Sequence, residues 1–257
     1  MDTILRGIRS IFLYEARRLL RPASSLLSCA LLLFPALMFF VVGRAEAHVS
    51  AGAGAALLFI AYPQVICVLS VLLRSPTLVN SELEAGTWVY LVSRPAGRVA
   101  LLLGKYLASA TFAALGCGLS VTLSAFVLMG SEAARGVLPA VLAPTLLAPY
   151  CFAAIFSLFG VLFVKRAMAI SLVYGVIVEF GLSNVPALVH QLTVSYSLRS
   201  LALRLCDSDL RREFAVAAGD PDRPVAMAVS LALITLGSLA LACVILERRQ
   251  IVQRPEE

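Results

Sequence analysis

Six long stretches of this chain carry almost no charge, and they constrain the fold more than any other feature of the sequence. A transmembrane helix needs about 20 consecutive apolar residues, and every stretch reaches that length. Only one of the six contains a charged residue, Glu179. The stretches are residues 24–43, 49–73, 106–130, 137–164, 167–189 and 225–246.

The overall composition excludes a soluble fold. Hydrophobic residues make up 60% of the 257 residues and charged residues 14%, whereas soluble domains average about 45–50% and about 25%. The same hydrophobicity excludes a disordered chain, because disorder requires few apolar residues. We therefore expect an all-α polytopic membrane protein in which residues 1–257 form a single transmembrane domain with six transmembrane helices.

The basic residues indicate how this domain is oriented. Six spans place both termini on one side, and 14 of the 21 basic residues then fall on that side. Cytoplasmic segments are enriched in Lys and Arg, so we predict cytoplasmic termini. The basic residues do not gather in one region, so the net charge of +6 indicates no nucleic-acid partner. Because all but two of them are arginine, we expect the inner (plasma) membrane of a bacterium with a GC-rich genome.

The segments outside the apolar stretches have distinct characters. Residues 1–21 place apolar side chains at helical spacing among arginines, which predicts an amphipathic helix on the inner leaflet. Residues 74–98 form the cytoplasmic loop, and residues 190–224 form the outer loop. The first half of the outer loop is too apolar to be free in water. Within 137–164 we expect three prolines to kink or break the helix: Pro139, Pro144 and Pro149.

No motif for nucleotide, metal or catalytic chemistry is present. A P-loop requires Gly-x4-Gly-Lys-Ser/Thr, but Gly97 and Gly104 are separated by six residues and Tyr106 follows Lys105. The two histidines and the cysteines, which lack Cys-x-x-Cys spacing, do not form a metal motif. We therefore expect neither enzymatic activity nor a cofactor in this chain.

Glu179 is the single ionisable residue deep inside an apolar stretch. A charged side chain at mid-membrane costs about 2.5–3.5 kcal/mol, which makes it a candidate functional residue. One interpretation is structural: Glu179 lies near the outer end of its span and is capped by backbone amides or by the outer segment. The other interpretation is an intramembrane polar site for substrate or protons that also includes Ser183 and Asn184.

The cytoplasmic loop carries a recognisable pattern. A Glu-x3-Gly-Thr element is followed by a leucine-containing turn, a Ser-Arg-Pro step and the pair Gly104-Lys105. This pattern resembles the loop between the second and third spans of permease subunits in type-2 exporters of the ATP-binding-cassette (ABC) class. The later stretch from Glu179 to Pro186, continuing to Ser200, is similar to the same family. The resemblance implies a short helical hairpin in the outer loop, before the last span.

The resemblance implies that the loop docks onto a separate ATPase subunit. The implied docking residues are Glu82, Glu84, Gly86, Thr87, Trp88, Leu91, Ser93, Arg94 and Pro95. Their local chemistry fits this role, because Ser81 and Glu84 have capping-box spacing and Gly86 permits a turn. Trp88 then supplies an aromatic anchor of the kind that dominates protein interfaces. The alternative is a connector that lies on the lipid headgroups with Trp88 at the interface.

The resemblance further implies two copies of the ATPase subunit, which would hold ATP and Mg²⁺, and a second permease copy. The expected function is therefore a permease subunit that forms the translocation path of an exporter. Two alternatives remain open: a proton-coupled secondary transporter that uses Glu179, and an intramembrane enzyme.

Overall fold

The computed structural model describes residues 2–19, 22–45, 50–84, 86, 97–181, 193–206 and 224–248. These residues are almost entirely helical and form no strand, which confirms the all-α prediction for the part described. The helices are α1 (Asp2–Leu19), α2 (Pro22–Ala45), α3 (Ala51–Phe59), η1 (Ile60–Ile66, a π-helix), α4 (Cys67–Leu72), η2 (Ser75–Thr77, a 3₁₀-helix), α5 (Asn80–Glu84), α7 (Gly97–Leu162), α8 (Ala167–Tyr174), η3 (Gly175–Gly181, a π-helix), α9 (Val194–Leu205) and α11 (Pro224–Arg248).

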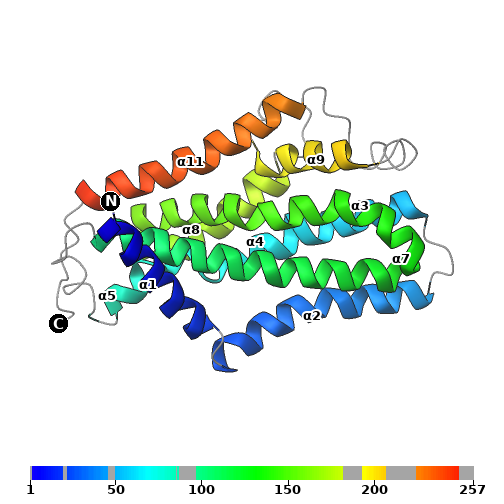
Figure 1. The fold of residues 1–257 in the computed structure, drawn as a ribbon, viewed down its shortest axis with the longest axis horizontal. Coiled ribbons are helices and arrows are strands. Elements are labelled where there is room, and N and C mark those ends of the chain that lie inside the picture. Colours follow the sequence, from blue (N-terminus) through cyan, green and yellow to red (C-terminus); the bar gives the residue numbers. More distant parts are fainter. Residues whose placement is uncertain are drawn as a thin grey trace.

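Helix α7 is the centre of the fold, and α1, α2, α3, α4, α8, α9 and α11 all pack against it. Its 66 residues form two arms that run in opposite directions (Figure 1). The arms meet at Gly130, whose backbone has φ 75° and ψ 175°. A side chain disfavours this conformation, so glycine at the end of the apolar stretch 106–130 permits the reversal.

The segment between the apolar stretches 106–130 and 137–164 is helical and not an irregular loop. Residues 131–136 are helical, and the second arm of α7 starts directly after Gly130. The segment Ser131-Glu-Ala-Ala-Arg135 explains the difference, because alanine, glutamate and arginine are strong helix formers. A charged segment between two apolar stretches therefore does not have to be a loop.

We expected three prolines to kink or break the outer half of the stretch 137–164. They do not break the helix. The backbone stays helical through Pro139, Pro144 and Pro149. A proline leaves the carbonyl four residues earlier without its helical donor. For Pro149 that carbonyl belongs to Thr145, and it accepts a hydrogen bond from Cys67 Sγ at 3.6 Å. The neighbouring helix thus satisfies the group that the proline frees.

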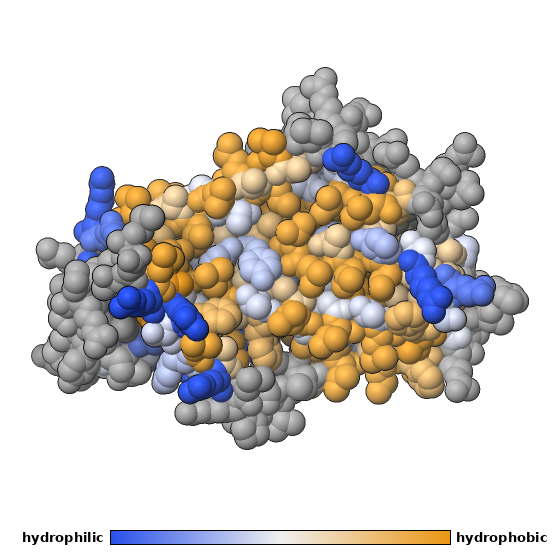
Figure 2. Space-filling model, viewed as in Figure 1, coloured by the Kyte–Doolittle hydropathy of each residue, from blue (hydrophilic) through white to orange (hydrophobic). Residues whose placement is uncertain are grey.

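The apolar helices indicate a membrane-embedded protein. Within the described ranges, the helical stretches long and apolar enough to cross a membrane are Ala51–Thr77, Gly97–Leu162 and Met227–Arg248. Ala30–Val41 and Ala167–Glu179 are apolar but shorter. Three such stretches do not support the expectation of six separate spanning helices. Figure 2 shows a face dominated by hydrophobic residues, with strongly hydrophilic ones towards its ends.

The N-terminal segment forms an amphipathic helix, as predicted, but it also packs against the protein. Helix α1 contacts the first arm of α7, where Gly104 leaves room for it. A Cβ atom on Gly104 would lie 2.8 Å from Ile11 Cγ2 and 3.1 Å from the backbone oxygen of Ile8. The start of α1, helix α5 and the end of α11 lie at one end of the molecule, and the turn of α7 lies at the other (Figure 1).

Candidate functional site

The start of the segment 74–98, the loop between the second and third apolar stretches, is fixed to α7 by a buried ion pair. Lys105 Nζ lies 2.5 Å from Glu82 Oε1, and the two side chains are only 3% and 13% exposed. Lys105 Nζ also donates hydrogen bonds to the backbone oxygen of Leu78 at 3.2 Å and to Ser81 Oγ at 3.1 Å. One ammonium group on the first arm of α7 thus has three acceptors on the segment that contains α5.

The second arm of α7 holds the same segment from another side. Gly160 is buried, and a Cβ atom there would lie 2.6 Å from the backbone oxygen of Pro76 in η2. Because backbone cannot yield as a flexible side chain does, this approach depends on glycine. Both arms of α7 therefore contact residues 76–82, and a displacement of this segment has to move α7 or break these contacts.

The predicted capping box at Ser81 and Glu84 does not form. Helix α5 begins at Asn80, and Ser81 lies inside it with its hydroxyl donating to the backbone oxygen of Leu78 at 3.2 Å. Glu84 instead accepts a hydrogen bond from Asn80 Nδ2 at 2.6 Å. The predicted turn at Gly86 is present, since this exposed glycine has φ 68° and its amide donates to the backbone oxygen of Leu83 at 3.2 Å.

The predicted docking residues do not share one environment in the structure. Glu82 faces Lys105 of its own chain, whereas Glu84 and Gly86 are exposed. The remaining docking residues, Thr87, Trp88, Leu91, Ser93, Arg94 and Pro95, lie outside the described residues.

Glu179 binds the first turn of helix α9. Its carboxylate is 2% exposed and lies in η3. Oε2 accepts hydrogen bonds from the backbone amide of Ser195 at 3.0 Å and from Ser195 Oγ at 2.7 Å. Oε1 accepts from the amide of Val194 at 3.3 Å and from the hydroxyl of Tyr174 at 3.1 Å.

This arrangement is a helix cap supplied from a distant segment. The first amides of a helix have no partner within it and carry partial positive charge, so a carboxylate stabilises them. The N-cap residue Thr193 contributes as well, accepting a hydrogen bond from the amide of Tyr196. Both Glu179 oxygens are thereby engaged, as in the structural interpretation of this residue. Ser183 and Asn184, the other members of the predicted polar site, lie outside the described residues.

A buried polar cluster between η1 and α7 was missed from the sequence. The Tyr62 hydroxyl lies 2.8 Å from Ser120 Oγ and 2.6 Å from Ser124 Oγ. Ser120 Oγ also donates to the backbone oxygen of Leu32 in α2, so the cluster joins three elements. The spacing of Ser120 and Ser124, one helical turn apart, was the available signal, because it places both hydroxyls on one face.

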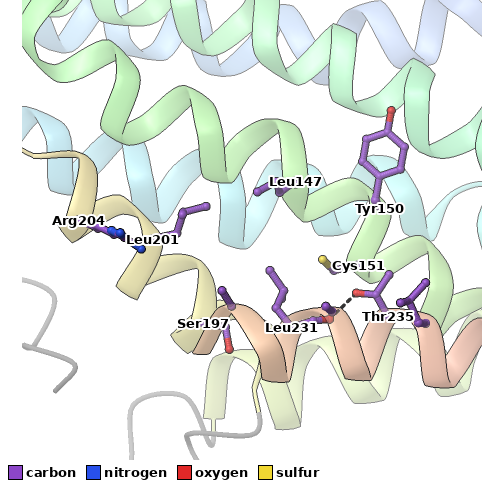
Figure 3. A pocket seen from close by; sticks show the side chains of 11 residues that line it. Leu147, Tyr150, Cys151, Ser197, Leu201, Arg204, Leu231 and Thr235 are labelled. Atoms are coloured by element: carbon purple, nitrogen blue, oxygen red, sulfur yellow. Dashed lines mark hydrogen bonds between the residues drawn. The ribbon is translucent and has the colours of Figure 1, made fainter. Parts of the chain in front are cut away.

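A cavity of about 440 Å³ opens between α9, α11 and the second arm of α7 (Figure 3). Its lining is mostly apolar and includes one charged residue, Arg204 of α9. No local sequence pattern indicates this α9–α11 cavity, since three separate segments contribute to it. It is lined by Leu147, Tyr150, Cys151, Ser197, Leu201, Arg204, Ala228, Leu231, Ala232, Thr235 and Leu236.

Among the described residues, no group of three or more His, Cys, Asp or Glu side chains is arranged to hold a metal ion. The ion pair and the hydrogen bonds described above either hold one helix to another or cap the start of a helix. Comparison of the sequence with protein-family models and with curated proteins finds no match.

Proposed function

We propose that this chain is the membrane-spanning permease subunit of an ABC exporter and works with a separate ATPase subunit. The observation that carries the proposal is the contact between Glu82 and Lys105. Both residues belong to the segment that resembles the exporter loop, and they lie at its two ends. Their pairing supports the view that this segment is one structural unit rather than a loose connector.

The contacts of this unit also suggest how force would pass from an ATPase to the membrane domain. A partner bound at residues 84–95 would push on α5, and α5 is joined to the first arm of α7 through Lys105. Gly160 of the second arm touches Pro76 in the same segment. ATP would drive transport only if it binds two conformations of the assembly with different affinity.

The proposal includes six spans and cytoplasmic termini. Helix α2, the continuous run α3–η1–α4, the two arms of α7, the run α8–η3 and α11 would be the spans. Two facts support this count: Gly130 divides α7 into two antiparallel arms, and Ala30–Val41 and Ala167–Glu179 are apolar. A second permease copy would complete the translocation path in the bacterial inner membrane.

The test is co-purification of tagged permease with an ABC ATPase from the same genome, followed by an ATPase assay in lipid. Trp88→Ala should weaken the affinity for the ATPase about thirtyfold, the effect of losing an aromatic anchor worth about 2 kcal/mol, and so lower the amount recovered. Glu82 is unsuitable for this test because it pairs with Lys105 inside the chain. Arg135→Ala, an exposed change on α7 outside the loop, serves as the control.

Two outcomes would contradict the proposal. One is wild-type recovery of the ATPase with Trp88→Ala, which would remove the loop as the docking element. The other is transport driven by a pH gradient in the purified chain without an ATPase, which would favour a proton-coupled secondary transporter.

A further inference from the structure

We infer that the α9–α11 cavity binds one acyl chain of an anionic membrane lipid, with the lipid headgroup at Arg204. The inference depends on membrane embedding alone and does not require the chain to be a permease. The cavity volume of about 440 Å³ lies within the range of small-molecule sites, about 300–1,000 Å³.

Helical spacing builds the cavity wall. Ser197, Leu201 and Arg204 follow one another at intervals of four and three residues on one face of α9. On α11 the lining residues from Ala228 to Leu236 recur at similar intervals. Eight residue steps of helix extend about 12 Å, so the α11 side of the wall covers about two helical turns.

The polar atoms of the wall are already bonded within the protein, apart from Arg204. Thr235 Oγ1 donates to the backbone oxygen of Leu231 at 2.7 Å. Ser197 Oγ donates to the backbone oxygen of Thr193 at 3.3 Å. The Tyr150 hydroxyl lies 3.2 Å from Thr111 Oγ1. The interior therefore offers an apolar surface, which suits a hydrocarbon chain.

Arg204 makes one end of the cavity cationic, so the two ends differ chemically. Arg204 and Leu201 lie at one end, and Cys151, Tyr150 and Thr235 lie at the other (Figure 3). The Arg204 side chain is exposed, and among the described residues it has no ion-pair partner. A cation at one end of an apolar cavity is complementary to an amphiphile with one anionic end, and a guanidinium group binds phosphate oxygens in a bidentate manner.

The cavity is open to the lipid phase. Leu147 and Leu236 line it, yet they remain 42% and 66% exposed. Helix α11 also keeps large apolar side chains exposed, among them Val229, Leu233 and Leu241. A chain can therefore enter from the bilayer without crossing protein. Because lipid tails are as apolar as the cavity wall, the chain itself supplies little selectivity. Selectivity should come from the headgroup at Arg204.

The experiment is native mass spectrometry of the full chain after reconstitution in equal amounts of phosphatidylglycerol and phosphatidylcholine with identical acyl chains. The wild-type protein should retain one phosphatidylglycerol with a preference of roughly tenfold, because its headgroup presents a net negative charge to Arg204, whereas the choline ammonium group of phosphatidylcholine neutralises the same phosphate. Arg204→Gln should abolish the preference, whereas Arg135→Gln, an exposed arginine outside the cavity, should preserve it. Ala232→Phe should fill the cavity and remove the retained lipid, whereas Ala240→Phe, on an exposed part of α11 beyond the cavity, should not.

If the wild-type protein retains phosphatidylglycerol and phosphatidylcholine equally, that result alone overturns the inference. An unchanged preference with Arg204→Gln would exclude the headgroup site. Unchanged retention with Ala232→Phe, in a protein whose thermal unfolding matches the wild type, would exclude the cavity as the binding site.

Discussion

Lys105 on the first arm of α7 and Glu82 in α5 form an ion pair 23 residues apart in sequence, with 2.5 Å between Nζ and Oε1. Both side chains are shielded from solvent, so the pair differs from a surface salt bridge, which contributes little. A buried charge that loses its partner is costly, because the remaining charge stays away from water. The contact therefore controls how firmly the loop is held to the membrane domain.

We expect Glu82→Ala to lower the free energy of unfolding by about 3 kcal/mol, because it leaves the Lys105 ammonium group buried and unpaired. Glu82→Gln should cost less, since its amide oxygen still accepts a hydrogen bond. Unfolding of the detergent-solubilised protein, followed by circular dichroism during titration with sodium dodecyl sulfate, measures the difference.

Glu84→Ala is the matched control, because Glu84 is exposed and its described partner is the side chain of Asn80. It should change the stability by no more than about 0.5 kcal/mol. Equal effects of Glu82→Ala and Glu84→Ala would mean that the ion pair does not hold the loop.

Glu179→Gln should loosen the start of α9. The glutamine amide keeps one acceptor oxygen but turns an NH₂ group towards donors that need an acceptor, which costs about 1–3 kcal/mol. The amides of Val194 and Ser195 then share one acceptor oxygen in place of a carboxylate, so their hydrogen exchange should accelerate about 5- to 150-fold. Hydrogen-exchange mass spectrometry of peptides that cover 193–206 tests this.

The control for Glu179 is Glu132→Gln, which changes an exposed acid on α7. It should leave exchange in 193–206 unchanged. Unaltered exchange with Glu179→Gln would show that the carboxylate is not the cap of α9 and would favour the proton-site interpretation instead.

Gly130→Ala should destabilise the turn between the two arms of α7 by about 1–3 kcal/mol, because a side chain disfavours φ 75° and ψ 175°. A Cβ atom at this position meets no other atom within 4 Å, so the cost comes from the backbone alone.

Gly237→Ala is the counterpart, since Gly237 lies inside α11 and its Cβ would also meet nothing within 4 Å. In a regular helix alanine is favoured over glycine by about 1 kcal/mol, so this change should be neutral or stabilising. Thermal unfolding of both variants in detergent gives the comparison. Equal unfolding midpoints of the two variants would mean that alanine adopts the backbone conformation of Gly130 without strain.

The sequence was most informative where one local pattern decides the outcome. Apolar stretches longer than 20 residues predict membrane helices, and the end of one stretch at Gly130 coincides with the turn of α7. The amphipathic spacing of residues 1–21 predicts α1, which the structure confirms over Asp2–Leu19. These predictions need no knowledge of neighbouring segments.

The features that the sequence did not reveal depend on contacts between distant segments. Glu82 was predicted to face a partner protein, but it pairs with Lys105 of its own chain. The sequence does not show this pairing, because the position of Lys105 relative to α5 is set only by packing. The prolines of α7 were expected to disrupt it, because the donor from Cys67 belongs to another helix. The α9–α11 cavity needs three helices at once. Tertiary context overrides local preference at each of these places.

The last prediction concerns topology, on which the cytoplasmic position of the loop depends. We expect both termini to be cytoplasmic, because 14 of the 21 basic residues then lie on the inner side. The start of α1 and the end of α11 lie at the same end of the molecule as α5 (Figure 1). Green fluorescent protein, which folds in the cytoplasm, should therefore fluoresce when fused after Glu257. Alkaline phosphatase, which is active only outside, should be active when fused to a chain truncated after Ala133 and inactive after Lys165. The reverse pattern at all three positions would place the loop outside the cell and would remove the docking role proposed for residues 82–95.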